Sequence, residues 1–193
     1  MNLSGRGRAR SPMFVIDSAT ALRVLREADA AELYALTEAN RAHLRRWLPW
    51  VDLVTSEEDS HSFLATVAAQ HQEGRGPTFG ILRAGALVGV VGYLPIDRVN
   101  RCAEIGYWLA EREQGRGVMT ACCQFVVRYG FLTLDLNRIQ IAAGTENIVS
   151  RAIPERLGFK FEGILRAREN LYGTFIDHAL YSLLRSEFDA AND

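Results

Sequence analysis

The sequence lacks the features of a membrane or secreted protein. No segment approaches the ~20 consecutive apolar residues that a membrane-spanning helix needs. The N-terminus has no apolar core of the kind found in signal peptides, so we expect a cytoplasmic protein. An excess of basic residues is also missing, because the formal net charge is −1. Binding nucleic acid over a large footprint requires a basic surface, so we expect no nucleic-acid partner.

Cysteine is scarce. The chain has 3 cysteines, which are Cys102, Cys122 and Cys123. Their number is odd and they lack CxxC spacing, so neither a disulfide framework nor a zinc site is predicted. We therefore expect buried free thiols.

The 4 histidines show no metal-ligating spacing, and no metal is predicted. His61 and His71 fall on or near the polar face of a predicted helix and should be solvated. His43 precedes a tryptophan-containing loop. His178 lies in the last predicted strand, where a structural role is expected.

The composition is that of a globular domain, with 193 residues, 48% hydrophobic and 23% charged. This length suits one domain with a sizeable core. Residues 1–17, which include Arg6, Arg8 and Arg10, are predicted to form a disordered tail. Residues 18–187 should form one domain and residues 188–193 a short tail.

Hydrophobic periodicity indicates an α/β domain with a mixed sheet. Ser56 and Asp59 form a capping signal at the start of a helix, and Gly85 marks the turn of a hairpin. Helices are predicted at about 28–40, 56–73, 118–134 and 147–157. Strands are predicted at 21–25, in the hairpin 78–97, and at 101–111, 137–144, 159–170 and 174–186.

The loop "EQGRGVMT" joins a predicted strand to a predicted helix. It lacks the lysine of a P-loop, and Thr120 replaces the third glycine of a dinucleotide fingerprint. Gly115 and Gly117 carry no side chains, so a bulky anion can approach the backbone closely. The free N–H groups at a helix start, the helix dipole and Arg116 would all favour an anion. The loop is therefore either a plain junction or an anion site.

Three motifs decide between these readings, because together they resemble the GNAT superfamily of acyl-CoA-dependent N-acyltransferases. The family signature [QR]-x-x-G-x-[GA] is matched by Gln114, Gly117 and Met119, although Met119 is larger than the usual small residue. The second motif is Asn147 and Ser150 followed by "LGF". "RRWLPWVD", "EIGYWL" and "FIDHALYSLL" resemble the ribosomal-protein N-terminal acetyltransferases of the RimJ/RimL type.

The resemblance covers residues 21–185 and implies a V-shaped mixed sheet of about seven strands. Acetyl-CoA, the implied co-substrate, would lie where two strands splay apart. Its pantetheine arm would pair with the strand end at Tyr107, Trp108 and Leu109, with help from Asn147. Its pyrophosphate would bind the loop and helix start, at Gln114, Gly115, Arg116, Gly117, Val118, Met119 and Thr120.

Acetyl transfer requires a neutral amine, and this requirement bears on the acceptor. At pH 7, deprotonating a lysine of pKa ~10.4 costs about 4.6 kcal/mol, whereas an α-amine of pKa ~7.8 costs only about 1 kcal/mol. A single carboxylate or a water relay could serve the α-amine, since general-base help is worth about 10²–10⁴-fold. This slightly favours a protein N-terminus without excluding lysine or a small amine.

The resemblance implies three catalytic candidates. Glu104 and Glu169 are alternative general bases, and both could contribute. Ser150 is the candidate acid toward the CoA sulfur, because the nearest following aromatic residue, Phe159, cannot donate a proton. The alternative is that Ser150 is a helix N-cap, and the two roles are compatible.

The leading hypothesis is an acetyl-CoA-dependent N-acetyltransferase acting on the N-terminal α-amine of a ribosomal or other protein. Trp47 and Trp50 would line its acceptor side. One alternative acceptor is a small amine, such as an antibiotic, polyamine or amino acid. Another alternative is a non-catalytic acyl-CoA-binding protein, and a homodimer is possible in either case.

Overall fold

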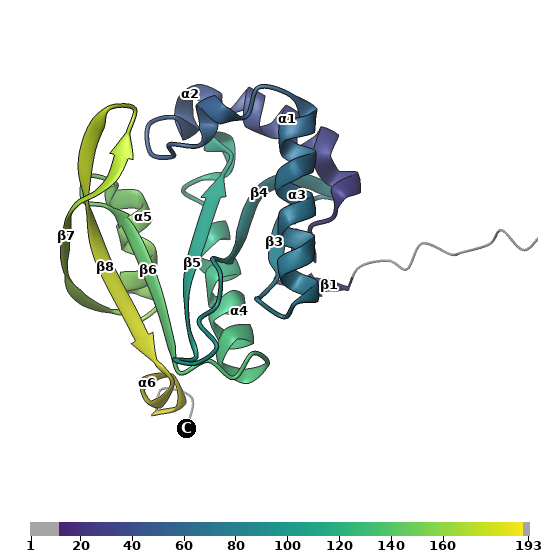
Figure 1. Ribbon diagram of the computed structural model, residues 1–193. Helices are drawn as coiled ribbons and strands as arrows, with labels where there is room; N and C mark the ends of the chain where they lie inside the picture. The colour runs from purple at the N-terminus through teal and green to yellow at the C-terminus, as the bar shows by residue number, and fades with distance from the viewer. Residues whose placement is uncertain (1–11, 191–193) are drawn as a thin grey trace, which may run out of the picture.

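The computed structural model describes residues 12–190, which form one eight-stranded mixed sheet flanked by helices (Figure 1). The strand order is β1-β2-β3-β4-β5-β6-β8-β7. The strands are β1 (Met13–Val15), β2 (Thr20–Val24), β3 (Thr78–Arg83), β4 (Ala86–Tyr93), β5 (Cys102–Leu109), β6 (Arg138–Gly144), β7 (Lys160–Leu171) and β8 (Thr174–Leu184). The expected α/β mixed-sheet class is confirmed, with eight strands in place of about seven.

Helices cover both faces of this sheet, and short 3-10 turns connect several elements. The α-helices are α1 (Ala30–Ala39), α2 (Arg41–Leu44), α3 (Glu57–Gln72), α4 (Val118–Leu132), α5 (Ile148–Arg156) and α6 (Arg185–Ala190). The 3-10 turns are η1 (Glu27–Asp29), η2 (Val51–Leu53) and η3 (Glu111–Glu113). No helix among the described residues is long and apolar enough to cross a bilayer.

Local sequence signals explain where several elements begin and end. The Ser56–Asp59 capping box is formed, and α3 starts directly after it. Ala84 and Gly85, both with positive φ, turn the chain between β3 and β4. Residues 13–15, inside the predicted disordered tail, instead pair with β2; residues 1–11 and 191–193 lie outside the described part of the chain. Helix α6 occupies part of the predicted C-terminal tail.

The sheet divides between β5 and β6. These strands pair in parallel over only three residues each, Cys102–Glu104 with Arg138–Gln140. Beyond that point β5 stays paired with β4, and β6 stays paired with β8. Figure 1 shows the two halves opening into a V. The backbone edges inside the V therefore have no strand partner from within the described chain.

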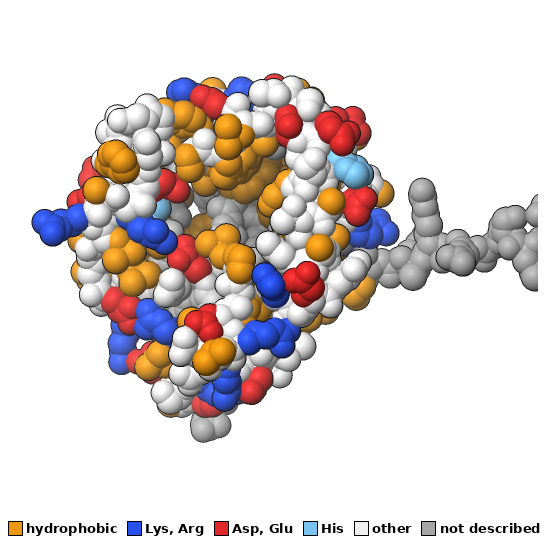
Figure 2. Space-filling view, viewed as in Figure 1, with side chains coloured by type: hydrophobic (Ala, Val, Ile, Leu, Met, Phe, Trp, Pro, Cys, Tyr) orange, Lys and Arg blue, Asp and Glu red, His pale blue; other side chains and the backbone are white. Residues whose placement is uncertain are grey.

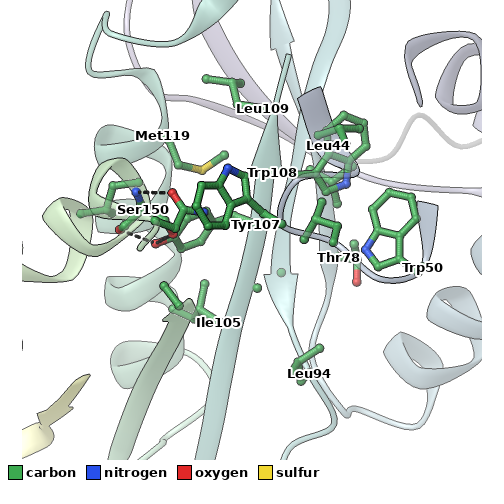
Figure 3. A pocket seen from close by; sticks show the side chains of 18 of the residues that line it. Leu44, Trp50, Thr78, Leu94, Ile105, Tyr107, Trp108, Leu109, Met119 and Ser150 are labelled. Atoms are coloured by element: carbon green, nitrogen blue, oxygen red, sulfur yellow. Dashed lines mark hydrogen bonds between the residues drawn. The ribbon is translucent and has the colours of Figure 1, made fainter. Parts of the chain in front are cut away.

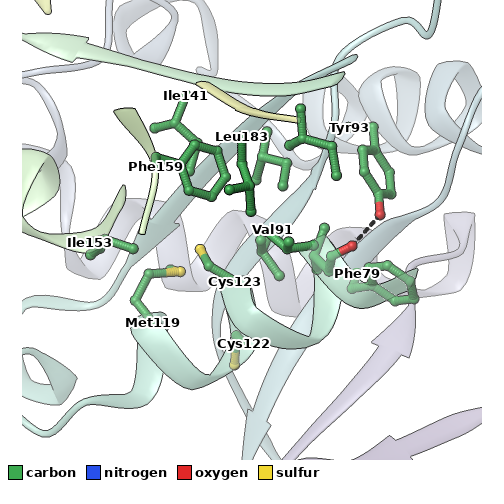
Figure 4. Packing of buried hydrophobic residues seen from close by; sticks show 14 of the residues in the cluster. Phe79, Val91, Tyr93, Met119, Cys122, Cys123, Ile141, Ile153, Phe159 and Leu183 are labelled. Carbon is green, nitrogen blue, oxygen red and sulfur yellow. Dashed lines mark hydrogen bonds between the residues drawn. The ribbon is translucent and has the colours of Figure 1, made fainter. Parts of the chain in front are cut away.

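Two hydrophobic clusters pack the helices against the two faces of the sheet. The larger cluster packs α4 and α5 against the sheet and includes Ile105, Leu109, Met119 and Ile153 (Figure 4). The smaller one packs α1 and α3 against the other face, where Trp108 contacts it. Because side chains alternate along a strand, odd-numbered residues of β5 face α4 and α5, and even-numbered ones face α1 and α3.

Candidate active site

A cleft of about 1520 Å³ occupies the opening between β5 and β6. Figure 2 shows the hollow, with hydrophobic side chains along its upper wall. The structure brings every predicted site residue to this cleft except Arg116. They are Trp47, Trp50, Glu104, Tyr107, Trp108, Leu109, Gln114, Gly115, Gly117, Val118, Met119, Thr120, Asn147, Ser150 and Glu169.

The start of α4 has the features of an anion cradle. Gly115 and Gly117 both adopt the left-handed conformation, with φ of 72° and 74°. Gly117 is the N-cap and provides no side-chain cap. The first N–H groups of α4 therefore lack a capping partner. A Cβ placed on either glycine would meet no atom within 4 Å, so both backbones border open space.

Three predicted residues beside this cradle, Met119, Gln114 and Arg116, have side chains that point to different parts of the structure. The side chain of Met119 is 7% exposed and packs in the larger core cluster (Figure 4), so its size does not obstruct the cradle. Gln114 places Nε2 2.8 Å from Nε2 of His43 on α2. The Arg116 side chain is 59% exposed and pairs with Glu113 at 3.8 Å, which puts it outside the cleft lining.

The edge of β5 offers unpaired backbone groups to the cleft. Leu94 N–H donates to the Glu104 carbonyl, and Ala110 N–H donates to the Val88 carbonyl. The backbone groups of even-numbered residues thus point toward β4. Those of Tyr107 and Leu109 point toward β6, where the strands have already separated. An extended, amide-containing arm could pair with this edge as an added strand does.

Tyr107 and Ser150 form a hydrogen-bonded pair on the α5 side of the cleft (Figure 3). The Ser150 hydroxyl donates to the Tyr107 oxygen at 3.2 Å, and the Tyr107 hydroxyl donates to the Ser150 carbonyl at 3.1 Å. That carbonyl is available because Pro154, four residues later, has no N–H to donate. Burial raises the pKa of the Tyr107 phenol well above its ordinary value, so the phenol remains protonated at neutral pH.

The N-cap of α5 is Asn147, not Ser150. Its Oδ1 accepts from the Ser150 N–H at 3.2 Å, and the helix begins at Ile148. The alternative reading of Ser150 as the N-cap is therefore wrong, and its hydroxyl is committed to Tyr107 instead. The amide NH₂ of Asn147 remains for a ligand, since Oδ1 alone serves the cap.

Glu104 lies at the vertex of the V, on the face toward α1 and α3. Its Oε2 accepts from Gln140 Nε2 at 2.9 Å, across the last register pair before the strands part. On the same face, Glu169 Oε2 lies 3.3 Å from His178 Nε2. The two predicted bases thus sit at different points of one cleft, each with its own polar neighbour.

The tryptophan loop, residues 45–52, closes the top of the cleft on its α1–α3 side. Trp50 packs near Trp108, with ring centroids 6.2 Å apart, on the side of β5 away from Ser150 (Figure 3). Tyr172, in the β7–β8 turn, donates to the Leu48 carbonyl at 2.7 Å. The Arg45 guanidinium lies 3.9 Å over the Tyr172 ring. The hairpin turn is thereby tied to the tryptophan loop across the mouth of the V.

Several residues of the site were not predicted from the sequence. His43, Arg156 and His178 line the cleft, whereas Gln140 and Tyr172 contact residues that line it or the loop beside it. His178 contacts Glu169 on the neighbouring strand, and the others contact partners far along the chain; Arg156, for example, reaches Thr120 Oγ1 at 3.4 Å. No local spacing signals such contacts.

The described residues contain no group of three or more metal-ligating side chains. The three cysteines are free, and Cys122 and Cys123 are buried as expected, whereas Cys102 is half-buried. Burial raises the pKa of Cys122 to about 12, so its thiol is protonated at neutral pH.

Comparisons with known proteins agree with this geometry. A family model described as an acetyltransferase (GNAT) domain matches residues 20–160. YdaF of Bacillus subtilis (strain 168) is 37% identical over 171 residues, which cover 87% of this chain and 92% of YdaF. The ribosomal-protein-serine acetyltransferase of Escherichia coli (strain K12) is 32% identical over 161 residues, covering 83% and 90%. A solved structure of RimL, a ribosomal L7/L12 alpha-N-protein acetyltransferase in complex with coenzyme A, matches with a TM-score of 0.87 at 28% identity, covering 91% of this chain and 99% of that one.

Proposed function

The chain belongs to the GNAT acetyltransferase family, and from that premise we propose that it transfers the acetyl group of acetyl-CoA to the N-terminal α-amine of a protein, with ribosomal proteins as the first candidates. The observation that carries the proposal is the divided sheet. Where β5 and β6 separate, one cleft is lined by residues from both faces of the sheet. Its α4–α5 side has donors suited to CoA, and its α1–α3 side has carboxylates suited to an amine. The relatives named above, whose names include ribosomal-protein acetyltransferases, supply the acceptor class.

The cofactor side is suited to CoA at three points. The free N–H groups at the start of α4, beside Gly115 and Gly117, would hold the pyrophosphate. The backbone of Tyr107 and Leu109 would pair with the pantetheine amides, with the Asn147 amide nearby. Acetyl-CoA, bound this way, supplies an activated thioester at the vertex of the V.

The leaving thiolate needs a proton, and the Ser150–Tyr107 pair is positioned to provide one. Both hydroxyls lie on the α5 side, which is the side assigned to CoA. Tyr107 is neutral because it is buried, and it orients the Ser150 hydroxyl by accepting from it. To protonate the sulfur, the Ser150 hydroxyl turns its hydrogen from Tyr107 to the thiolate, and the Tyr107 hydroxyl turns from the Ser150 carbonyl to donate to the serine oxygen until that oxygen regains a proton from solvent.

The acceptor side favours a peptide terminus over a polyamine. Its walls are largely apolar, with Trp47, Trp50, Phe63 and Leu94 among the lining residues. A polycation requires several unpaired carboxylates along its length. Of the carboxylates that line the cleft, Glu104 is bonded to Gln140 and Glu169 faces His178. The others are Asp59, which caps α3, Glu111 beside His43, Glu113 paired with Arg83, and Glu146. One amine can be received at this site, with an apolar wall beside it for the following side chain.

The test is a thiol-release assay with acetyl-CoA and a panel of acceptors. The panel contains ribosomal-protein N-terminal peptides, the same peptides blocked at the α-amine but carrying a lysine, and polyamines. We expect free thiol with unblocked peptides only. Release with polyamines only would indicate a small-amine enzyme. CoA binding without thiol release from any acceptor would indicate a non-catalytic acyl-CoA-binding protein and would refute the proposal.

A further inference from the structure

His178 and Glu169 form a carboxylate–imidazole pair inside the cleft. The His178 side chain is 14% exposed and that of Glu169 is 29% exposed, and both line the cleft wall. His178 Nε2 lies 3.3 Å from Glu169 Oε2, yet it is buried and makes no hydrogen bond of good geometry within the described chain. A buried ring nitrogen facing a carboxylate is best satisfied when it carries a proton.

A β-bulge brings the two side chains close together on one face of the sheet. Strand β7 pairs Leu165 with His178 and then Glu169 with Ile176, so four residues of β7 match two of β8. Ala167, at φ 49°, lies in the bulge, and its N–H donates to Asp177 Oδ1. A regular ladder would place residue 167 opposite Ile176. The bulge puts Glu169 there, on the face that His178 shares.

His178 is closer to the opening of the V than Glu169 is. The strand order runs β6, β8, β7 away from the opening, so β8 with His178 lies between the edge strand β6 and β7 with Glu169 (Figure 1). The β6 residue paired with His178 is Gly144, which has no side chain to stand between the ring and the opening. The Cβ position of Gly144 lies 3.5 Å from Ile176 Cδ1 and 3.8 Å from the Trp47 ring, so these two side chains border the space beside Gly144.

We propose that His178 is a further catalytic residue, which takes the proton of the acceptor amine while Glu169 positions and stabilises the imidazolium. This inference rests on the proposed N-acetyltransferase function. The ammonium form of the acceptor gives one proton to the His178 ring nitrogen that faces away from Glu169. The neutral amine then forms the C–N bond to the acetyl carbon. The C–S bond breaks, and its electron pair leaves with the CoA sulfur. The nitrogen loses its second proton as the amide forms, and the sulfur takes up one proton through the Ser150 hydroxyl, so the products are the amide, the CoA thiol and protonated His178.

The proposal changes the role of Glu169, which acts through His178. Imidazole suits the task because it exchanges protons near neutral pH, which is close to where an α-amine also titrates. Among the described residues, the charged partner of His178 is Glu169 from β7.

The experiment compares variants of the full chain by steady-state kinetics with an N-terminal peptide and acetyl-CoA. His178→Gln and His178→Asn should lower kcat by at least about 10²-fold, the lower end of general-base catalysis, and leave the Kd for CoA unchanged. Added imidazole should restore activity to His178→Ala, which a purely structural role would not allow. The double variant with Glu169→Gln should be no slower than His178→Gln alone, because the two residues act as one unit. His71→Gln, on the exposed face of α3, is the matched control and should retain parental activity.

The outcomes separate this inference from the proposed function. If the parent transfers no acetyl group to any amine, the proposed function fails and the inference fails with it. If the parent is active and folded His178→Gln and His178→Asn remain within 3-fold of it, only the inference fails. It also fails if Glu169→Gln loses as much activity as His178→Gln and imidazole does not rescue His178→Ala, because Glu169 would then be the base itself.

Discussion

The cradle at the start of α4 gives the sharpest test of how this protein holds CoA, through Gly117→Ala. Gly117 has φ 74°, and an alanine in that conformation costs about 1–2 kcal/mol. Its Cβ would meet no protein atom, so the added methyl group would project into open space at the cleft. The substitution should therefore both strain the backbone and obstruct a phosphate.

Gly158 separates these two effects. It ends α5 with φ 79°, also has open space at its Cβ position, and does not line the cleft. Gly158→Ala and Gly117→Ala should destabilise the fold by similar amounts, which for a chain of this length lowers Tm by about 2–8 °C. Only Gly117→Ala should weaken CoA binding. Loss of one charge-assisted hydrogen bond, worth about 1.5–3 kcal/mol, corresponds to roughly a 10- to 150-fold rise in Kd.

Calorimetric titration of both variants with CoA and with pantetheine, which lacks the phosphates, checks this reasoning. The deficit of Gly117→Ala should appear with CoA and disappear with pantetheine. If Gly117→Ala binds CoA within about 2-fold of Gly158→Ala, the phosphates do not lie against this glycine. The assignment of the α4 start as their cradle would then be refuted.

Three further predictions concern other parts of the structure. Ser150→Ala and Tyr107→Phe should each lower kcat with little change in the KM for acetyl-CoA, and the double variant should be no worse than the poorer single one; additive losses in kcat would contradict a shared proton path. Glu162→Gln should lower stability by about 1 kcal/mol at pH 7, a value reduced for solvent screening, because the Arg138 guanidinium lowers the pKa of that carboxyl to about 2. This stabilisation is complete above the unfolded pKa near 4.5 and is lost as pH falls toward 2, so denaturant titrations of parent and variant should converge over that range; a constant difference would contradict it. Tyr172→Phe removes the hydrogen bond to the Leu48 carbonyl and should raise the KM for the acceptor peptide several-fold while leaving the Kd for CoA unchanged; an unchanged acceptor KM would show that the tie does not shape the acceptor side.

The sequence was most informative where a structure depends on residues close together in the chain. The Ser56–Asp59 capping box, the Gly85 turn and the glycines before α4 are all where local physics predicts them. Helix geometry also explains why the size of Met119 does not obstruct the anion site, because its position in the first turn directs its side chain into the core. Element order therefore identified the α/β class without any knowledge of long-range contacts, and the resemblance of three motifs to GNAT proteins pointed to the family.

The tertiary structure alone decided how the site is assembled. Gln140 reaches Glu104 across 36 positions, Tyr107 reaches Ser150 across 43, and His43 reaches Gln114 across 71. From the sequence, His178 in the last strand is expected to be structural, and only the bulge in β7 brings Glu169 next to it. Such contacts depend on strand register and on where two strands stop pairing. Both are set by packing of the whole sheet, since a shift of one residue moves every side chain to the opposite face.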